Sequence, residues 1–287
     1  MTYQLTDEKT VKQILAKHGI VLSKARGQNF LINPTVCPRM AQASGATKAD
    51  GVLEIGPGVG VLTAELAKVA GKVVTVEVDK GLPPVLAETL ADFDNITLVE
   101  GDILKTDVKA LLDTHFQGMK VMVCANLPYY ITTDILMMLL ESGIPFASIT
   151  VMVQKEFAAR MCAPVGSRES GAITVGAAYR AKCERIFTVS GGSFLPPPKV
   201  DSTVMRLTPY ETPPVEVVNE PFFFKMIKAG FNQRRKTMVN ALNAGMGFSK
   251  EQITTALEGC NLSPTVRIEQ LNLEQLAQLA NALFLLK

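Results

Sequence analysis

The sequence predicts an α/β protein in which a doubly wound parallel sheet is followed by a small domain made only of helices. Between residues 51 and 161, short apolar runs rich in Val and Ile alternate with stretches of helical spacing. This alternation is typical of a parallel sheet with helices on both faces. After Pro221 the strand signals stop and only helical signals remain. The length of 287 residues suits one large domain with a smaller one beside it.

The first half of the chain supplies the elements of this sheet in a regular order. Residues 6–17 are predicted to form a short helix with Thr6 as its cap, because Asp7 and Glu8 then fall in the first turn. Beyond residue 50, strands and helices then alternate at a steady pitch. The predicted strands are 51–58, 72–79, 96–102, 120–126 and 148–154, and the predicted helices are 59–71, 81–93, 104–116, 132–143 and 155–161.

The pattern changes in the last third of the chain. Residues 184–210 contain two β-rich runs joined by a Gly/Pro loop, which we expect to form an antiparallel pair at the end of the sheet. Residues 211–220 have the composition of a linker, and residues 221–287 carry only helical signals. We therefore predict a sheet domain over 1–210, whose residues 1–50 form an N-terminal helical segment, a linker over 211–220 and a helical domain over 221–287.

Charge and cysteine usage narrow the class of protein. The net charge is +3 over residues 1–30, −5 over residues 31–220 and +4 over residues 221–287. Basic ends suggest an anionic partner, although ordinary solvated lysines give the same balance. The five cysteines form no CxxC pair and the two histidines have no partners at ligand spacing, so neither disulfides nor a metal is expected. No signal peptide core or long apolar run occurs, so we expect a cytoplasmic protein without a membrane segment.

A glycine-rich turn and two carboxylates indicate an adenosine site. Gly56 and Gly58 follow the first strand of the sheet, in LEIGPGVG, and glycines there allow a ligand to approach the backbone at a helix start. Glu77 ends the next strand, where a carboxylate can accept both hydroxyls of a ribose. Asp102 ends the third strand, where it can accept from the exocyclic amine of an adenine. Parallel strands share their carboxyl edge, so these groups belong to one site in a Rossmann-like sheet.

The glycine spacing favours S-adenosylmethionine over a dinucleotide. Dinucleotide sites prefer G-x-G-x-x-G, whereas Val61 stands here where the third glycine would be. An NAD-dependent dehydrogenase is also disfavoured because no histidine is placed for hydride chemistry. The expected cofactor is S-adenosylmethionine, with S-adenosylhomocysteine as the product.

The stretch VCANLPYYITT places an amide, a proline and two aromatics where the fourth strand ends. The side-chain oxygen of Asn126 and a backbone carbonyl near Leu127 or Pro128 can accept both N–H bonds of an adenine amine and aim its lone pair at a methyl group. Pro128 fixes the backbone, and Tyr129 can stack on a base that has left its helix. Phe194, in a proline-rich loop, either closes the other face of that base or plugs the core.

These residues resemble the motifs of the ribosomal RNA adenine dimethyltransferases, most closely those of the small-subunit type. The resemblance implies a class I S-adenosylmethionine-dependent methyltransferase sheet with a reversed last strand and a helical RNA-binding domain. It also implies N6,N6-dimethylation of two adjacent adenosines in the 3′-terminal hairpin loop of 16S rRNA, within the immature 30S subunit. Nothing suggests an obligate dimer, so a monomer is expected. The motifs are GQNFL (27–31), LEIGPGVGVLT (53–63), VEVD (76–79), GD (101–102), NLPYY (126–130), QKEFAAR (154–160), FLPPPKVDS (194–202) and FNQRRKTM (231–238).

The resemblance also assigns roles to residues. The N-terminal segment closes over the cofactor, NLPY forms the catalytic corner and Phe194 flanks the target base. The positions that contact the cofactor are Asn29, Leu31, Gly56, Glu77, Asp102 and Asn126, to which the glycine turn adds Gly58. The candidate phosphate contacts are Lys24, Arg26, Arg234, Arg235 and Lys236, although a solvated surface role suits any one of them.

Two other hypotheses remain at this point. One is the related large-subunit enzyme that confers macrolide resistance, whose members usually carry a different residue after the Asn and lack the basic FNQRRKT helix. The other is a ribosome-assembly factor that kept the fold and lost its activity, which the intact Glu77, Asp102, Asn126 and Tyr129 oppose.

Overall fold

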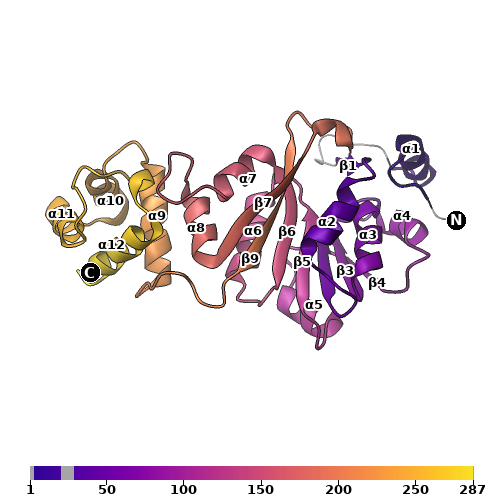
Figure 1. Ribbon diagram of the computed structural model, residues 1–287, viewed down its shortest axis with the longest axis horizontal. Helices are drawn as coiled ribbons and strands as arrows, with labels where there is room; N and C mark the ends of the chain where they lie inside the picture. Colours follow the sequence, from indigo (N-terminus) through magenta and orange to yellow (C-terminus); the bar gives the residue numbers. More distant parts are fainter. Residues whose placement is uncertain (1–2, 21–28, 287) are drawn as a thin grey trace. The chain divides into compact units, whose positions relative to one another are not determined.

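The computed structural model describes residues 3–20 and 29–286, and the chain packs as two compact units (Figure 1). The sheet unit comprises Met1–Ala158 and Glu184–Pro209, and the helical unit comprises Ala159–Cys183 and Tyr210–Lys287. The predicted division of the chain into a sheet domain, a linker over residues 211–220 and a helical domain remains a prediction. Within the described ranges, no helix is both long enough and apolar enough to cross a membrane.

A seven-stranded sheet forms the centre of the sheet unit, in the order β4-β3-β2-β5-β6-β9-β7. Strands β4, β3, β2, β5 and β6 run parallel, and β9 lies antiparallel to β6. The predicted parallel sheet with a reversed strand beside it is confirmed. The strands are β2 (Gly51–Ile55), β3 (Lys72–Glu77), β4 (Ile96–Glu100), β5 (Val121–Asn126), β6 (Ser148–Gln154), β7 (Ala181–Val189) and β9 (Ser202–Pro209).

The strand order places a functional site at one edge of the sheet. The first strand, β2, pairs with β3 on one side and with β5 on the other, so the order of the strands reverses between β2 and β5. Ligands of doubly wound sheets bind outside the carboxyl ends of the strands at such a switch point. All five residues of β2 are buried, because helices cover both faces of the sheet (Figure 1).

The described residues up to Met161 form seven helices, of which α2 (Val36–Ser44) was not predicted as a separate helix. Residues 36–44 form a helix although Pro38 interrupts the helical signal, because Pro is tolerated in the first turn, where its missing N–H needs no partner. The helices are α1 (Glu8–Lys17), α2 (Val36–Ser44), α3 (Val61–Val69), α4 (Pro83–Thr89), α5 (Val108–His115), α6 (Thr132–Glu141) and α7 (Lys155–Met161).

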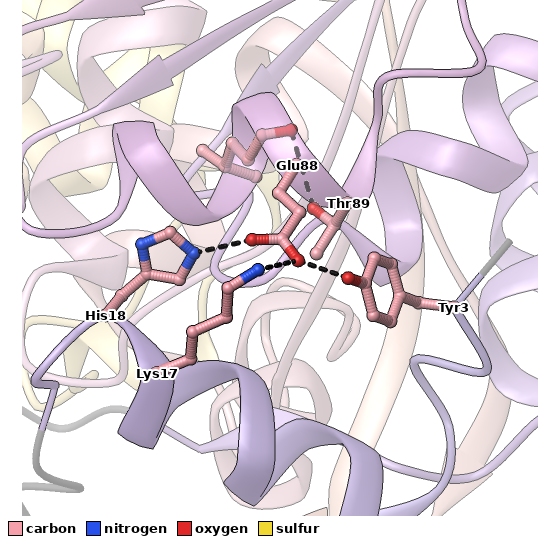
Figure 2. A network of polar contacts seen from close by, with 6 residues as sticks. Tyr3, Lys17, His18, Glu88 and Thr89 are labelled. Atoms are coloured by element: carbon pink, nitrogen blue, oxygen red, sulfur yellow. Dashed lines mark hydrogen bonds and ion pairs between the residues drawn. The ribbon is translucent and has the colours of Figure 1, made fainter. Parts of the chain in front are cut away.

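The N-cap of the N-terminal helix α1 lies one residue later than predicted. Hydrogen bonds and an ion pair connect this helix to α4. Asp7, not Thr6, is the N-cap, because its carboxylate accepts the N–H of Thr10 at 2.8 Å. Figure 2 shows the polar contacts that join the two helices around the carboxylate of Glu88 on α4. That carboxylate accepts from Lys17 Nζ at 2.7 Å, lies 2.9 Å from His18 Nε2 and accepts from the hydroxyl of Tyr3.

A two-residue strand pair links two segments that lie far apart in the sequence. Strand β1 (Phe30–Leu31) pairs antiparallel with β8 (Phe194–Leu195), with Leu31 opposite Phe194. The short 3₁₀ turn η2 (Gly191–Ser193) precedes β8, and its Ser193 carbonyl accepts the N–H of Ile32 at 2.9 Å. The sequence did not predict this pair, which ties the GQNFL and FLPPPKVDS motifs together.

The helical unit buries its own apolar core. Phe223 on α9 is fully buried, and its ring centroid lies 5.5 Å from that of Tyr179 on α8. Side-chain caps begin four of its helices, at Asn219, Thr237, Ser249 and Asn272. Its helices are α8 (Ala172–Arg180), α9 (Glu220–Asn232), α10 (Met238–Met246), α11 (Lys250–Gly259) and α12 (Leu273–Phe284), with the 3₁₀ turn η3 (Ile268–Gln270).

Candidate active site

A cavity of about 750 Å³ lies at the carboxyl edge of the sheet, within the sheet unit. This volume is in the range of about 300–1,000 Å³ that small-molecule sites occupy. Every predicted cofactor and catalytic residue lines the cavity, so the structure brings together side chains that lie as far apart in the sequence as Asn29 and Phe194. These residues are Asn29, Leu31, Gly56, Gly58, Glu77, Asp102, Asn126, Leu127, Pro128, Tyr129 and Phe194.

The glycine turn between β2 and α3 lies against this cavity. Gly56 has φ +69° and Gly58 has φ +61°, a backbone region that L side chains rarely adopt. A Cβ at Gly58 would also lie 3.3 Å from the ring of Phe30, whereas the space beside Gly56 is open. The turn thus presents bare backbone to a ligand at the start of α3.

Two carboxylates follow the next strands: Glu77 is the last residue of β3, and Asp102 lies two residues beyond the end of β4, not at its end as predicted. Glu77 is only 6% exposed, and its carboxylate accepts the N–H of Asp79 at 2.7 Å. Burial raises the pKa of Glu77, which backbone N–H groups partly offset. Asp102 is more exposed and accepts the N–H of Leu104 at 3.1 Å, with Lys105 Nζ 3.7 Å away. Both carboxylates accept backbone N–H groups and line the cavity.

Glu54 is a cavity residue whose role the sequence did not predict. It is the fourth residue of β2, is 1% exposed and lines the cavity. Among the described residues, neither carboxylate oxygen has a hydrogen-bond partner of normal geometry, although the hydroxyls of Thr63 and Thr75 are close. Burial raises the pKa of Glu54 to about 8. The hydroxyls of Thr63 and Thr75 offset part of this rise. The available signal was the lone acidic residue inside an otherwise apolar strand.

The NLPYY corner begins where β5 ends. Asn126 is the last residue of the strand, and the N–H of Leu127 donates to the carbonyl of Met152 at 3.2 Å. The Pro128 carbonyl accepts from the hydroxyl of Thr132 at 2.9 Å and from the N–H of Ile131 at 3.3 Å. Because these bonds engage both lone pairs of the Pro128 carbonyl, the Leu127 carbonyl is the better acceptor for a ligand.

Two aromatic rings line the cavity near this corner. The hydroxyl of Tyr129 lies 2.7 Å from Ser202 Oγ, and burial raises the pKa of the Tyr129 phenol. Phe194 is 2% exposed and belongs to the apolar core of the sheet unit, yet it also lines the cavity. Its burial fits the role of core plug that was weighed from the sequence, and the other role, closing one face of a target base, stays a prediction.

The structure describes three of the five predicted phosphate contacts, all in the helical unit. Lys24 and Arg26 lie outside the described residues. In the helical unit, Arg234 forms an ion pair with Glu269 and donates to the carbonyl of Arg168, so its guanidinium already has structural partners. The neighbouring candidates, Arg235 and Lys236, are exposed. No group of three or more His, Cys, Asp or Glu within residues 3–20 and 29–286 is arranged to hold a metal ion.

The sequence is similar to a family of RNA-modifying enzymes. Residues 22–284 match the family model described as ribosomal RNA adenine dimethylase. The ribosomal RNA small subunit methyltransferase A of Shouchella clausii is 45% identical over 94% of this chain and 93% of its own length. The protein of the same name from Streptococcus sanguinis is 42% identical over 98% of each chain.

Solved structures agree with this similarity. A dimethyladenosine transferase from Plasmodium falciparum superposes with a TM-score of 0.73 at 28% identity, covering 87% of this chain and 95% of its own. The 23S rRNA methyltransferase ErmE superposes with a TM-score of 0.69 at 26% identity, covering 89% of this chain and all of its own.

Proposed function

The chain belongs to the ribosomal RNA adenine dimethylase family, and on that premise we propose that it dimethylates two adjacent adenosines of 16S rRNA. The target amines are the N6 groups of adenosines in the 3′-terminal hairpin loop, within the immature 30S subunit. Relatives named small subunit methyltransferase A, at 41–45% identity over nearly the whole chain, support the choice of subunit. The proposal rests chiefly on one observation: Glu77, Asp102 and the NLPYY corner line the same cavity.

The cavity residues fit S-adenosylmethionine, which when bound supplies a methyl group on a positively charged sulfur. Glu77 is placed to accept the ribose hydroxyls, and Asp102 to accept the adenine amine of the cofactor. The unpartnered carboxylate of Glu54 suits the positive charge of such a ligand. The open space beside Gly56 leaves room for the cofactor to approach the backbone of the turn. Asn29 and Leu31 complete the set from the N-terminal segment, which we propose closes over the cofactor.

The catalytic corner prepares the target amine. The lone pair of an adenine N6 amine is delocalised into the ring, so the amine is a poor nucleophile. Asn126 Oδ1 and the Leu127 carbonyl accept its two N–H bonds and hold the nitrogen nearer to tetrahedral geometry. Its lone pair then points along the line of methyl transfer, and this orientation supplies much of the rate. The resulting ammonium is strongly acidic and loses its proton to water.

Two aromatic rings hold the extruded base. Tyr129 and Phe194 line the same cavity, and we assign them to the two faces of the target adenine. Base–aromatic stacking of this kind is worth roughly 1–3 kcal/mol per base, which offsets part of the cost of unstacking. Arg234, Arg235 and Lys236 are the described candidates for phosphate contacts, and Arg235 and Lys236 are the more exposed of the three. Lys24 and Arg26 lie beyond the described residues. We further propose a cytoplasmic, monomeric enzyme that needs no metal.

A second candidate function is methylation of large-subunit RNA, which the similarity to ErmE favours. An assay with labelled S-adenosylmethionine and purified ribosomal subunits that lack the modification distinguishes the two candidate functions. We expect N6,N6-dimethyladenosine in small-subunit RNA. Methylation of large-subunit RNA alone would establish the second candidate. Binding to small subunits without methyl transfer would identify an assembly factor and contradict the proposed activity.

A further inference from the structure

Two consecutive residues, Asp201 and Ser202, connect the two aromatic rings that we assign to the target adenine. We call this ring pair, Tyr129 and Phe194, the base clamp. Ser202 is the first residue of β9 and is fully buried. Its Oγ lies 2.7 Å from the hydroxyl of Tyr129, and its backbone pairs with Gln154 on β6. A buried side chain on a strand inside the sheet, between β6 and β7, thus anchors one ring of the clamp.

Asp201 acts on the segment that carries the other ring. Its Oδ1 accepts the N–H of Gly191 at 3.3 Å, at the start of the 3₁₀ turn that leads directly into Phe194. A Cβ at Gly191 would lie 2.9 Å from the Pro198 carbonyl oxygen, so the turn has no room for a side chain at this position. The carbonyl of Asp201 accepts the N–H of Lys155 at 2.9 Å, so the aspartate is itself held by the start of α7.

The far end of this turn is also fixed. The Ser193 hydroxyl accepts from Asn33 Nδ2 at 3.1 Å, and the Ser193 carbonyl accepts the N–H of Ile32. Phe194 then pairs with Leu31. Its position is therefore set by β1 on one side and by Asp201 on the other.

Neither Asp201 nor Ser202 lines the cavity, so both act on the base clamp from outside it. We propose that Asp201 and Ser202 are positioning residues for methyl transfer, which set the orientation and spacing of the base clamp. This inference rests on the proposed function, because it needs an adenine between the two rings. A misplacement of about 1 Å at a reacting centre can cost about 100-fold in rate, so loosening one ring is expected to lower kcat by about 10- to 100-fold.

The test for Ser202 compares Ser202→Ala, Tyr129→Phe and the double variant. The two single changes remove the same hydrogen bond from opposite ends. Thr203→Ser is the matched control, since Thr203 is buried on the same strand but points to the other face of the sheet. The measurements are kcat and KM with small subunits, cofactor affinity by calorimetry, and the midpoint of thermal unfolding.

We expect both single variants to lose kcat by similar factors and the double variant to lose no more than either one. Cofactor affinity should stay within twofold of that of the Thr203→Ser control. Full activity of Ser202→Ala, or losses that multiply in the double variant, would overturn the role of Ser202. If Ser202→Ala fails to fold, Tyr129→Phe still tests the same bond while leaving Ser202 in place.

Asp201 is tested by comparing Asp201→Asn with Asp201→Ala. Asparagine keeps an oxygen that can accept the N–H of Gly191 and loses the charge that faces Lys155 Nζ 3.8 Å away. We expect Asp201→Asn to keep most of the rate and Asp201→Ala to lose at least tenfold in kcat. Equal losses in both variants would overturn positioning through this bond. Transfer by the wild type with full activity in all variants rejects this inference alone, whereas no transfer by the wild type rejects the proposed function as well.

Discussion

The buried carboxyl group of Glu54 gives the ligand-free protein a distinctive dependence of stability on pH. The pKa of Glu54 is raised from 4.5 to about 8, because burial disfavours its charged form. Between these two values the unfolded chain has lost the proton while the folded protein still holds it. The free energy of unfolding therefore falls as the pH rises from about 4.5 to about 8.

The size of this effect follows from the pKa shift. One pKa unit corresponds to about 1.36 kcal/mol, so this group alone removes about 3 kcal/mol of stability between pH 5 and pH 8. In Glu54→Gln the side chain keeps its size and cannot ionise. The stability of the variant relative to the wild type should therefore rise by about 3 kcal/mol over the same interval.

Urea unfolding at pH 5, 6.5 and 8 measures this difference directly. Glu100→Gln, at an exposed glutamate that ends β4, is the matched control and should follow the wild type. A difference between Glu54→Gln and the wild type that does not change with pH would refute the assignment of a buried, unpartnered carboxyl group.

The same group links cofactor binding to proton release. A cationic ligand beside Glu54 favours the ionised carboxylate, so binding of S-adenosylmethionine at pH 7 should release close to one proton. Calorimetry in two buffers of different ionisation enthalpy counts the protons released. Glu54→Gln should release none and should bind more weakly, and equal proton release in both proteins would contradict a contact between Glu54 and the cation.

Three further predictions concern other parts of the molecule. The carboxylate of Glu88, whose pKa is lowered to about 2 chiefly by its bond from Lys17, stabilises the fold above pH 4.5. Its contribution disappears as the pH falls from about 4.5 to about 2, and acid unfolding of Glu88→Gln should lack this component. Gly58→Ala should lower the free energy of unfolding by about 1–3 kcal/mol, because a side chain there must adopt a positive φ beside an aromatic ring. Arg235→Ala should reduce the slope of log affinity for RNA against log salt by about 1, whereas Arg234→Ala should chiefly lower the unfolding temperature. A salt slope unchanged in Arg235→Ala would remove that residue from the phosphate contacts.

The sequence predicted the parts of the site that lie where strands end. Glu77 and Asn126 each close an apolar run, Asp102 follows another run two residues after its strand ends, and parallel strands necessarily bring their carboxyl ends to one edge. The β-rich runs after residue 184 likewise predicted two neighbouring strands at the end of the sheet, β9 and β7, and the resemblance to the family implied the reversed strand β9, which is confirmed.

Features that depend on tertiary contacts could not be predicted from the sequence. The pairing of Leu31 with Phe194 involves strands of two residues, which are too short to show a period. The helix over 36–44 was hidden by Pro38, and the cap at Asp7 lay one residue from the predicted one. Whether a glutamate inside a strand has a hydrogen-bond partner depends on the residues packed around it. The sequence therefore could not show that Glu54 lacks a partner of normal geometry.

The central claim is that the NLPYY corner presents an adenine amine of small-subunit RNA for methylation. The most direct measurement maps N6,N6-dimethyladenosine in small-subunit RNA after reaction with the wild type and with Asn126→Ala. The account predicts dimethyladenosine at two adjacent loop positions with the wild type and at least a 100-fold slower reaction with the variant. Dimethyladenosine formed equally well by Asn126→Ala, or formed only in large-subunit RNA, would contradict it.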